Sequence, residues 1–365
     1  MLGRKVREWT EGLHRVPDLT KEISWNDGGQ EYVAKFTEQP GDDDTSIERV
    51  LVEISTSVDG NRFSSAMALR RVAFSGFAQF VNRWDPDVEI HNDELDGRFH
   101  ANSRIRLAYD RRTKPVFHAK VTTSAREVDI TRISGIVRKS QIFQGGLETG
   151  VRAIRLPRHY APFPDGLSRT DADVHQLTND VRIEFLPDGS YTLDYLESAA
   201  IDKAGEISRD VTYFLADKDT SVHVRGVVNG KVLIYSPKRI VVEGDLVYAQ
   251  DPRVTPESDD FLGLVSDGHV DVAAPDVTGP GDLVIHAAIY ARRRFNVRDI
   301  RSTGTSELHL YGSLSAGTVS ATEPRYSTRI QFDQRLTEVR PPGFPLTDRY
   351  EVESWDKRWT SESSH

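Results

Sequence analysis

One short run of the sequence constrains the fold more than any other, KVLIYSPKRIVVEGDLVYA at residues 231–249. Apolar residues alternate with their neighbours in three successive stretches, and SPK and EG separate these stretches. Alternation with period two is typical of strands whose two faces differ in burial. Strands of an antiparallel sandwich recur about every 8–12 residues, and the present ones recur faster. We therefore expect short strands joined by sharp corners.

Similar stretches recur through the C-terminal half of the chain. The segments RIVVEGDLVYA, GHVDVAAP with DLVIHAAIYA, and SELHLYGSLSAG each give a strand, a break and a second stretch with small residues. Their spacing of about 30–40 residues indicates a degenerate repeat with loop insertions. The pattern predicts a right-handed β-helix, or β-solenoid, over residues 91–320, with an antiparallel sandwich as the alternative. Glycines stand at the predicted corners, namely Gly226, Gly230, Gly244, Gly268 and Gly312.

Residues 1–90 are expected to form a separate, smaller region. EYVAKF and VLVEISTSV have the alternation and the β-branched content of strands. In residues 64–84, apolar side chains including Leu69, Val72, Phe77 and Val81 recur at helical spacing. The sequence therefore predicts one amphipathic helix at residues 64–84, placed to cover the N-terminal end of the solenoid.

Residues 181–196, VRIEFLPDGSYTLDYL, predict a hairpin inserted in the solenoid. The turn would be Pro187, Asp188 and Gly189. The apolar residues expected to face one another are Val181, Ile183 and Phe185 on the first strand and Tyr191, Leu193 and Tyr195 on the second.

Residues 321–365 are expected to form a proline-rich arm followed by a capping strand. PPGFPL is stiff and extended, and YEVESW alternates as a strand does. An open solenoid end exposes unpaired backbone that needs a cover. We therefore expect the strand at residues 350–355 to close the C-terminal end of the solenoid, with Trp355 substantially buried.

Composition excludes several classes of function. The 365 residues include 47 Lys and Arg against 56 Asp and Glu, a net charge of −9, which argues against broad nucleic-acid binding. The chain has no cysteine, so disulfides and thiolate metal sites are excluded. No run approaches the ~20 apolar residues of a membrane helix, and no signal peptide follows Met1. We expect either a cytoplasmic protein or an export segment upstream of this sequence.

Five blocks in fixed order resemble an uncharacterised bacterial domain family found on type IV pilin-like and other surface proteins. They span residues 55–355 approximately. The blocks are DGRFHAN with PVFHAKVTT, FQGG with IRLP, RIVVEGDLVYA with DDFLGLVSDGHVDVA, VIHAAIYA with LHLYGSL, and PPGFPLTDRYEVESW.

This resemblance implies a cell-surface or extracellular protein with a β-helical ectodomain and a small pilin-like β region. It implies other pilus or surface proteins as partners. Glycans are a further expected partner class, and we expect no cofactor. The leading prediction is therefore a non-catalytic structural or adhesion protein. The alternatives are a β-helical enzyme that cleaves polysaccharides by hydrolysis or elimination, and a cytoplasmic β-helix that forms polymers.

The enzyme alternative depends on three residues. Asp259 and Asp260 are adjacent, and His269 follows closely. Two carboxyl groups and an imidazole could provide acid–base chemistry on a glycosidic bond. Neighbouring strand residues point to opposite faces, however, so Asp259 and Asp260 need not share a site. We therefore expect no catalytic site.

Other polar residues are expected to serve the fold. His100 and Asn102, in the first block of the resemblance, are predicted to bond corner backbone, because buried polar groups need partners. Gly244 and Gly312 are predicted to be structural corners. A metal site would need several histidines to lie above one another on successive turns of the solenoid, and the candidates are His223, His269, His286 and His309. A single histidine that forms hydrogen bonds within its own turn is the more common arrangement. We therefore expect no metal site.

Overall fold

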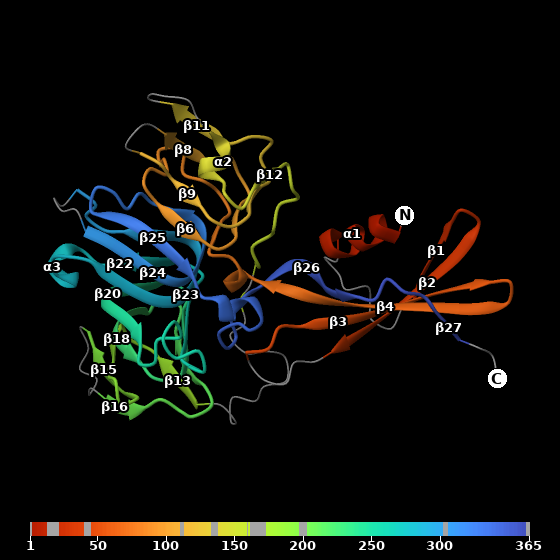
Figure 1. The fold of residues 1–365 in the computed structure, drawn as a ribbon. Helices are drawn as coiled ribbons and strands as arrows, with labels where there is room; N and C mark the ends of the chain where they lie inside the picture. The colour runs from red at the N-terminus through yellow and green to blue at the C-terminus, as the bar shows by residue number, and fades with distance from the viewer. Residues whose placement is uncertain are drawn as a thin grey trace. The chain divides into compact units, whose positions relative to one another are not determined.

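The computed structural model describes most of the chain, and strands dominate its described part, which confirms the prediction of a mainly β protein. The chain divides into two compact units. We call Met1–Ala73 with Leu346–His365 the terminal unit and Phe74–Pro345 the central unit (Figure 1). The predicted boundaries at residues 90 and 320 are therefore wrong, because the last strands join the N-terminal sheet. The described residues are 2–12, 22–39, 45–109, 113–132, 138–158, 160, 173–196, 203–301 and 306–362.

The terminal unit is an antiparallel sheet with one helix. Its strands run in the order β1-β2-β3-β4-β26, and β27 also pairs with β4. Strands β2 and β3 lie where EYVAKF and VLVEISTSV predicted them. The elements are α1 (Leu2–Gly12), β1 (Ile23–Asp27), β2 (Gln30–Gln39), β3 (Arg49–Val58), β4 (Asn61–Ala73), β26 (Leu346–Trp355) and β27 (Thr360–Glu362).

Helix α1 completes the core of the terminal unit. Its Val6 and Trp9 are buried with apolar residues of the sheet. The Trp9 ring meets Trp25 and Phe36 edge-on, at centroid distances of 5.7 and 5.5 Å. Aromatic contacts of this geometry add to the stabilisation from burial alone. None of the helices in the described residues is both long and apolar enough to cross a membrane.

The predicted helix at residues 64–84 is wrong. The segment contains most of β4, the 3-10 turn η1 (Phe74–Gly76) and β5 (Gln79–Val81). Burial alternates through Met67 and Leu69, so period two also fits the apolar residues. The missed signal is Asp59-Gly60, where both residues have positive φ and form the two-residue turn between β3 and β4. Asp-Gly between alternating stretches favours a hairpin, and this hairpin fixes β4 as a strand.

The predicted C-terminal strand is confirmed, but its predicted capping role is wrong. Strand β26 pairs antiparallel with β4 inside the terminal unit, where Trp355 lies opposite Met67. Tyr350 is buried, whereas Trp355 packs against the core of the terminal unit and is only partly buried, less than the substantial burial predicted. The physical reason is the same missed strand: β4 offers a backbone edge that another strand can pair with.

The central unit contains a mixed sheet in which 19 of its described strands are linked, and a separate pair formed by β8 (Arg106–Tyr109) and β11 (Asp129–Arg132). It also contains α2 (Lys139–Ile142), α3 (Pro275–Thr278) and the 3-10 turn η2 (Gln334–Thr337). Besides β5, the large sheet comprises β6 (Glu94–Asp96), β7 (Phe99–Ala101), β9 (Val116–Phe117), β10 (Val121–Thr123), β12 (Leu147–Thr149), β13 (Asp173–Leu177), β14 (Val181–Phe185), β15 (Ser190–Tyr195), β16 (Lys203–Glu206), β17 (Thr212–Ala216), β18 (Ser221–Val228), β19 (Lys231–Ser236), β20 (Arg239–Tyr248), β21 (Phe261–Ser266), β22 (His269–Val272), β23 (Leu283–Val297), β24 (Ser306–Val319) and β25 (Tyr326–Phe332).

Most pairings in the central unit are parallel and form two ladders that meet at β23. One ladder runs β13–β17–β19–β21–β23, and the other runs β14–β18–β20–β22–β23. Strand β24 follows β23 in parallel. The three stretches of KVLIYSPKRIVVEGDLVYA become β19 and the two halves of β20, so the predicted strands and their first corner are confirmed.

Strands from the beginning of the central unit's sequence extend the ladders beyond β24. Strands β5, β7, β10 and β12 stack in parallel beside β24, and β6 and β9 stack beside β25. Figure 1 shows orange β6 and β9 next to blue β25. Segments far apart in the sequence are therefore neighbours at this level of the sheet, and the sequence pattern did not reveal that pairing.

The predicted hairpin at residues 181–196 is confirmed. Val181 lies opposite Tyr195, Ile183 opposite Leu193, and Phe185 opposite Tyr191, as the alternation predicts. Strand β14 also pairs in parallel with β18, so the hairpin belongs to the large sheet.

The two corner glycines predicted to be structural, Gly244 and Gly312, differ in whether glycine is required. Gly312 has a φ of +137°, and a Cβ there would lie 2.1 Å from the carbonyl oxygen of Ala287 on the neighbouring strand. At Gly244 a Cβ would meet only the Arg225 Cβ, at 3.8 Å, which is an ordinary contact. The close parallel approach therefore demands glycine at 312 and tolerates a side chain at 244.

Candidate functional site

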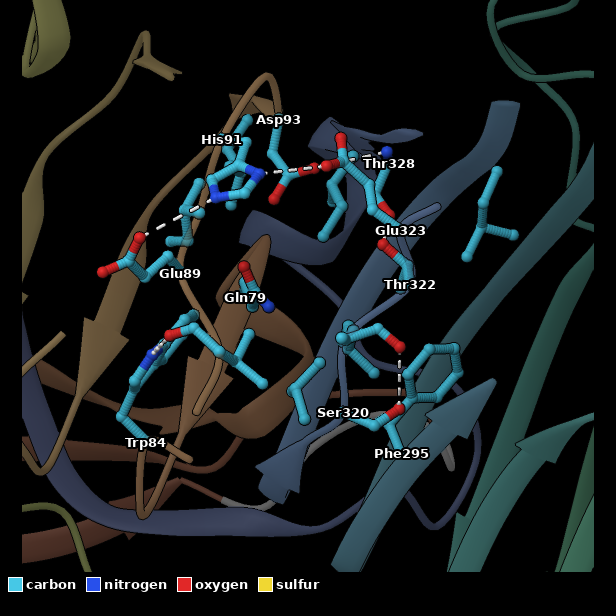
Figure 2. A pocket seen from close by; sticks show the side chains of 18 of the residues that line it. Gln79, Trp84, Glu89, His91, Asp93, Phe295, Ser320, Thr322, Glu323 and Thr328 are labelled. Atoms are coloured by element: carbon cyan, nitrogen blue, oxygen red, sulfur yellow. Dashed lines mark hydrogen bonds and ion pairs between the residues drawn. The ribbon is translucent and has the colours of Figure 1, made fainter. Parts of the chain in front are cut away.

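A cavity of about 480 Å³ lies in the central unit, where the early strands stack on the late ones. We call it the inner cavity (Figure 2). Its lining comes from β5, β6, β8, β23, β24, β25 and the two segments 84–93 and 319–323. Ligand-binding cavities in proteins have volumes of about 300–1,000 Å³, so this one is large enough for a small organic molecule.

Strand alternation produces the apolar walls of the inner cavity. Leu308, Leu310 and Leu314 line it from β24, and all three are buried. The parallel register places Ile330 opposite both Leu310 and Leu95, and both neighbours also line the cavity. Because every second residue points inward, three neighbouring strands together present a continuous apolar surface.

Carboxyl groups gather among the polar lining residues. His91 binds Glu323 through Nδ1 at 3.1 Å and approaches Glu89 through Nε2 at 3.8 Å. Arg106 forms an ion pair with Glu89 at 3.0 Å. The third acidic group is Asp93, and Figure 2 shows Glu89, His91, Asp93 and Glu323 along one side of the cavity. We call these five residues the acidic rim.

Asp93 is the most perturbed group of the acidic rim. Asp93 is partly buried and lines the cavity. Burial, followed by the nearby charge of Glu323, raises the pKa of Asp93 to about 7, although the Thr328 N–H and the charge of His91 oppose the shift. The Thr328 N–H donates to Asp93 Oδ1 at 3.3 Å. Among the described residues, no Lys or Arg forms an ion pair with Asp93.

Gln79 adds an unusual polar group to the lining. The residue is 7% exposed and lines the inner cavity from β5. Within the described ranges, no residue hydrogen-bonds its side-chain amide, and Figure 2 shows the amide among the lining side chains without a dashed line. The amide atoms are not among the fully buried side-chain atoms without a partner, so they reach open space, and a group bound in the cavity could pair with them.

These features fit binding chemistry. The cavity combines apolar walls with a few polar groups that converge, which is the usual composition of a small-molecule site. A carboxyl group with a pKa near 7 is also typical of functional sites, where it can exchange a proton or bind a cation. The cavity is too small to hold a long stretch of polysaccharide.

A second hollow of about 470 Å³ lies on strands β6, β24 and β25, and we call it the outer groove. Four side chains form what we call the charged row: Glu307, Arg329, Glu94 and His118. Arg329 contacts Glu307 at 3.1 Å and Glu94 at 3.2 Å, and His118 contacts Glu94 at 2.7 Å. The hydrogen bond with Glu94 is the main reason why the pKa of His118 is raised.

The other end of the outer groove is cationic and aromatic. The Arg253 guanidinium lies 4.8 Å from the centre of the Tyr311 ring, a cation–π contact. Arg253 also forms an ion pair with Asp251 at 2.6 Å. Burial, and then the charge of Arg253, lower the pKa of His286 to about 4, so this imidazole is neutral at pH 7.

The structure does not bring the three catalytic candidates together. Asp260 is buried and accepts from the N–H groups of Gly230 at 2.6 Å and Gln250 at 2.8 Å, while Asp259 is exposed. His269 begins β22, on the far side of β21 from Asp260. A strand of six residues spans about 20 Å, so Asp260 and His269 lie at opposite ends of it. The carboxyl group of Asp260 holds loop backbone.

His100 and Asn102 form a buried polar chain. His100 bonds Thr122 Oγ1 through Nδ1 and Asn102 Oδ1 through Nε2, both at 2.8 Å. Asn102 accepts from the Ile154 N–H at 2.8 Å and donates to the Ile154 carbonyl at 2.6 Å. Asn102 thus bonds backbone, as predicted, whereas these two bonds of His100 are with side chains.

The four histidines considered as metal ligands do not lie opposite one another on neighbouring strands. His223 pairs with Val241, His269 with Arg239, His286 with Tyr311, and His309 with Arg329. In the described part of the chain, no group of three or more His, Asp or Glu side chains is arranged to hold a metal ion.

Sequence reasoning missed Gln79, Asp93 and Glu323. Gln79 lies in the segment that was assigned to a helix, and its inward position follows from the strand. Asp93 belongs to the acidic stretch HNDELD, and Glu323 precedes Pro324, but nothing in either stretch signals a cavity. The parallel pairing of β25 with β6 brings these two segments together.

Comparisons with known proteins give a distant likeness. No family model and no curated protein matches this sequence. Among solved structures, the chain matches the competence-associated pilin ComZ from Thermus thermophilus, with 12% identity and a TM-score of 0.37. The match covers 94% of this chain and 87% of that one. At this score the likeness carries no argument about fold or function.

Proposed function

We propose that this chain is a non-catalytic bacterial surface protein, a scaffold and binding module whose central unit is a β-helix. The parallel ladders support the β-helix, because parallel strands need crossover connections and successive turns of a solenoid supply them. The pairs β13–β17, β17–β19, β19–β21 and β21–β23 keep one direction through the ladder. A right-handed coil follows from the usual chirality of such crossovers.

The charged row carries the proposal. Its side chains lie across neighbouring strands of the sheet, from Glu307 through Arg329 and Glu94 to His118. Neighbouring strands are about 4.8 Å apart, so the row presents ionic groups at a regular interval on a rigid support. Such a surface suits an extended partner with repeating polar groups, such as a surface glycan or a protein filament.

A non-catalytic role agrees with how the candidate acids are used. Both carboxyl oxygens of Asp260 accept backbone N–H groups. His118 is engaged by Glu94 and by Gln144 at 2.9 Å. Acid and imidazole groups held in this way by the fold are typical of structural networks.

Localisation is the first test of the proposed function. Antibodies against the central unit should label intact cells of the source bacterium, and protease added outside should remove the signal. The protein should also sediment with sheared surface filaments or cell-wall glycans. A signal that appears only after permeabilisation would overturn the surface proposal and favour the cytoplasmic β-helix polymer.

Turnover assays test the absence of catalysis. Neutral and acidic polysaccharides should show no new reducing ends and no unsaturated products after incubation with the pure protein. Cleavage that disappears in Asp260→Ala, with the fold preserved, would establish the carbohydrate-active enzyme instead.

A further inference from the structure

We propose that the inner cavity is a binding site for a small organic ammonium, a compact apolar body that carries a protonated amine. The inference goes beyond the proposed function, because it concerns a ligand of the cavity and holds wherever the protein resides. Three observations support it: apolar walls, an acidic rim that includes a carboxyl group without an ion-pair partner among the described residues, and the Gln79 amide, which lines the cavity and has no hydrogen-bond partner among them.

The walls select an apolar body. Leu308, Leu310 and Leu314 from β24 face the cavity together with Leu95 and Ile330. These side chains are apolar and line the cavity, so a ligand there would lie against hydrocarbon. Covering apolar surface contributes roughly 25 cal/mol per Å², which favours a ring or a short alkyl chain over a polar solute.

The acidic rim selects a positive charge. Glu89 is occupied by Arg106, and Glu323 by His91, at 3.0 and 3.1 Å. Asp93 receives one backbone N–H, from Thr328, and no ion pair from the described residues. An ammonium group has three donors, so it can bond Asp93 and still reach a second rim carboxylate. An anionic ligand would meet the negative charge of Glu323 and would oppose ionisation of Asp93.

Gln79 selects a second polar group on the ligand. Its amide lines the cavity and has no described partner, so it can donate to or accept from a hydroxyl group of the ligand. The best ligand therefore carries an ammonium group for Asp93 and a hydroxyl group for Gln79. Tyramine has both groups on an aromatic body, and phenethylamine lacks only the hydroxyl group.

Calorimetric titration of the full chain with matched probes tests the inference. The probes are phenethylamine, its neutral isostere 2-phenylethanol, and the anion 3-phenylpropionate. Because charge-assisted hydrogen bonds are strong, phenethylamine should bind at least about tenfold more tightly than 2-phenylethanol. The anion should bind more weakly still. Tyramine should bind about threefold to tenfold more tightly than phenethylamine.

Two variants assign the selectivity to residues. Asp93→Asn should remove the preference for phenethylamine over 2-phenylethanol, and Asp259→Asn, the same change at an exposed carboxylate outside the lining, should retain it. Gln79→Leu should remove the advantage of tyramine over phenethylamine. Near-ultraviolet circular dichroism checks that each variant is folded. If Asp93→Asn does not fold, Glu323→Gln provides a second variant of the acidic rim.

Proton release gives an independent readout. Near pH 6.5 Asp93 is largely protonated, and the charged groups around it are Glu323, His91, Glu89 and Arg106. An ammonium ligand should displace the Asp93 proton, so the measured heat should depend on the ionisation enthalpy of the buffer, and Asp93→Asn should abolish that dependence. Equal affinities for amine and alcohol, or amine binding weaker than about 10 mM, would overturn the inference.

Discussion

The terminal unit and the central unit build their sheets in opposite ways. In the terminal unit, β1 pairs with β2 and β3 with β4 across two-residue turns, Gly28-Gly29 and Asp59-Gly60, whose residues all have positive φ. In the central unit, most strands pair in parallel with partners from another level of the ladder, and β5 pairs with β24. Local turns set the register in the first unit, and stacking of distant segments sets it in the second.

This difference explains where a cavity can form. An antiparallel hairpin brings neighbouring residues together, and the terminal unit fills its core with rings such as Trp9 and Phe36. In the central unit, early strands β5 and β6 meet late strands β24 and β25, which arrive from different parts of the chain. The inner cavity lies at that meeting, with Gln79 and Asp93 on the early side and Glu323 on the late side.

The largest expected effect comes from truncation after Pro345. The change removes β26 and β27, which both pair with β4, and takes Tyr350 out of the terminal core. We expect the terminal unit to lose its cooperative unfolding transition and the protein to associate through the exposed edge of β4. Tryptophan fluorescence during urea unfolding and sedimentation velocity measure the two effects.

The central unit controls for this truncation, because none of its described strands includes a deleted residue. Phenethylamine binding to the inner cavity should be retained. A monomeric truncated protein with an unchanged unfolding midpoint would contradict the assignment of β26 to the terminal sheet.

A single methyl group should break the parallel ladder. Gly312→Ala combines a positive φ with a Cβ placed 2.1 Å from the Ala287 carbonyl oxygen. Strained backbone costs about 1–3 kcal/mol and the clash adds to it, so we expect the free energy of unfolding of the central unit to fall by at least about 3 kcal/mol. Gly244→Ala is the matched control and should cost less than about 1 kcal/mol. Urea denaturation measures both, and equal costs would contradict the close approach at Gly312.

The contrast between the two units also explains how much of the structure the sequence predicts. The hairpin at residues 181–196 was predicted to the residue, because turn and alternation agree locally. The strand β4 was missed because apolar spacing in residues 64–84 fits period 3.6 as well as period two, and Asp59-Gly60 was not used. The inner cavity could not be predicted, since Asp93 and Glu323 become neighbours only through the stacking of β25 on β6. Stacking register depends on packing across the whole ladder, which no local motif records.

The pH dependence of stability should differ between wild type and Asp93→Asn. The pKa of Asp93 rises from its ordinary value of 3.8 to about 7 in the folded protein. The folded state therefore binds this proton more tightly than the unfolded state, and its contribution to stability is fully present below pH 3.8 and lost as the pH rises through 7. Because the group also faces the cavity, solvent reduces the effect. Urea midpoints measured between pH 5 and 8 should fall less with rising pH in Asp93→Asn; parallel curves would contradict the raised pKa.

The smallest expected effect tests the contrast between the two units at a turn of the terminal unit. Gly60→Ala places a side chain at a φ of +81°, as Gly312→Ala does at +137°, but a Cβ at Gly60 meets no atom within 4 Å. Only the backbone strain remains, and we expect a cost of about 1 kcal/mol in the free energy of unfolding. Gly60→Asn should recover part of it, because Asn tolerates this conformation better than Ala does. If Gly60→Ala proved as costly as Gly312→Ala, positive φ alone would explain both positions, and close parallel stacking would not be what distinguishes the central unit.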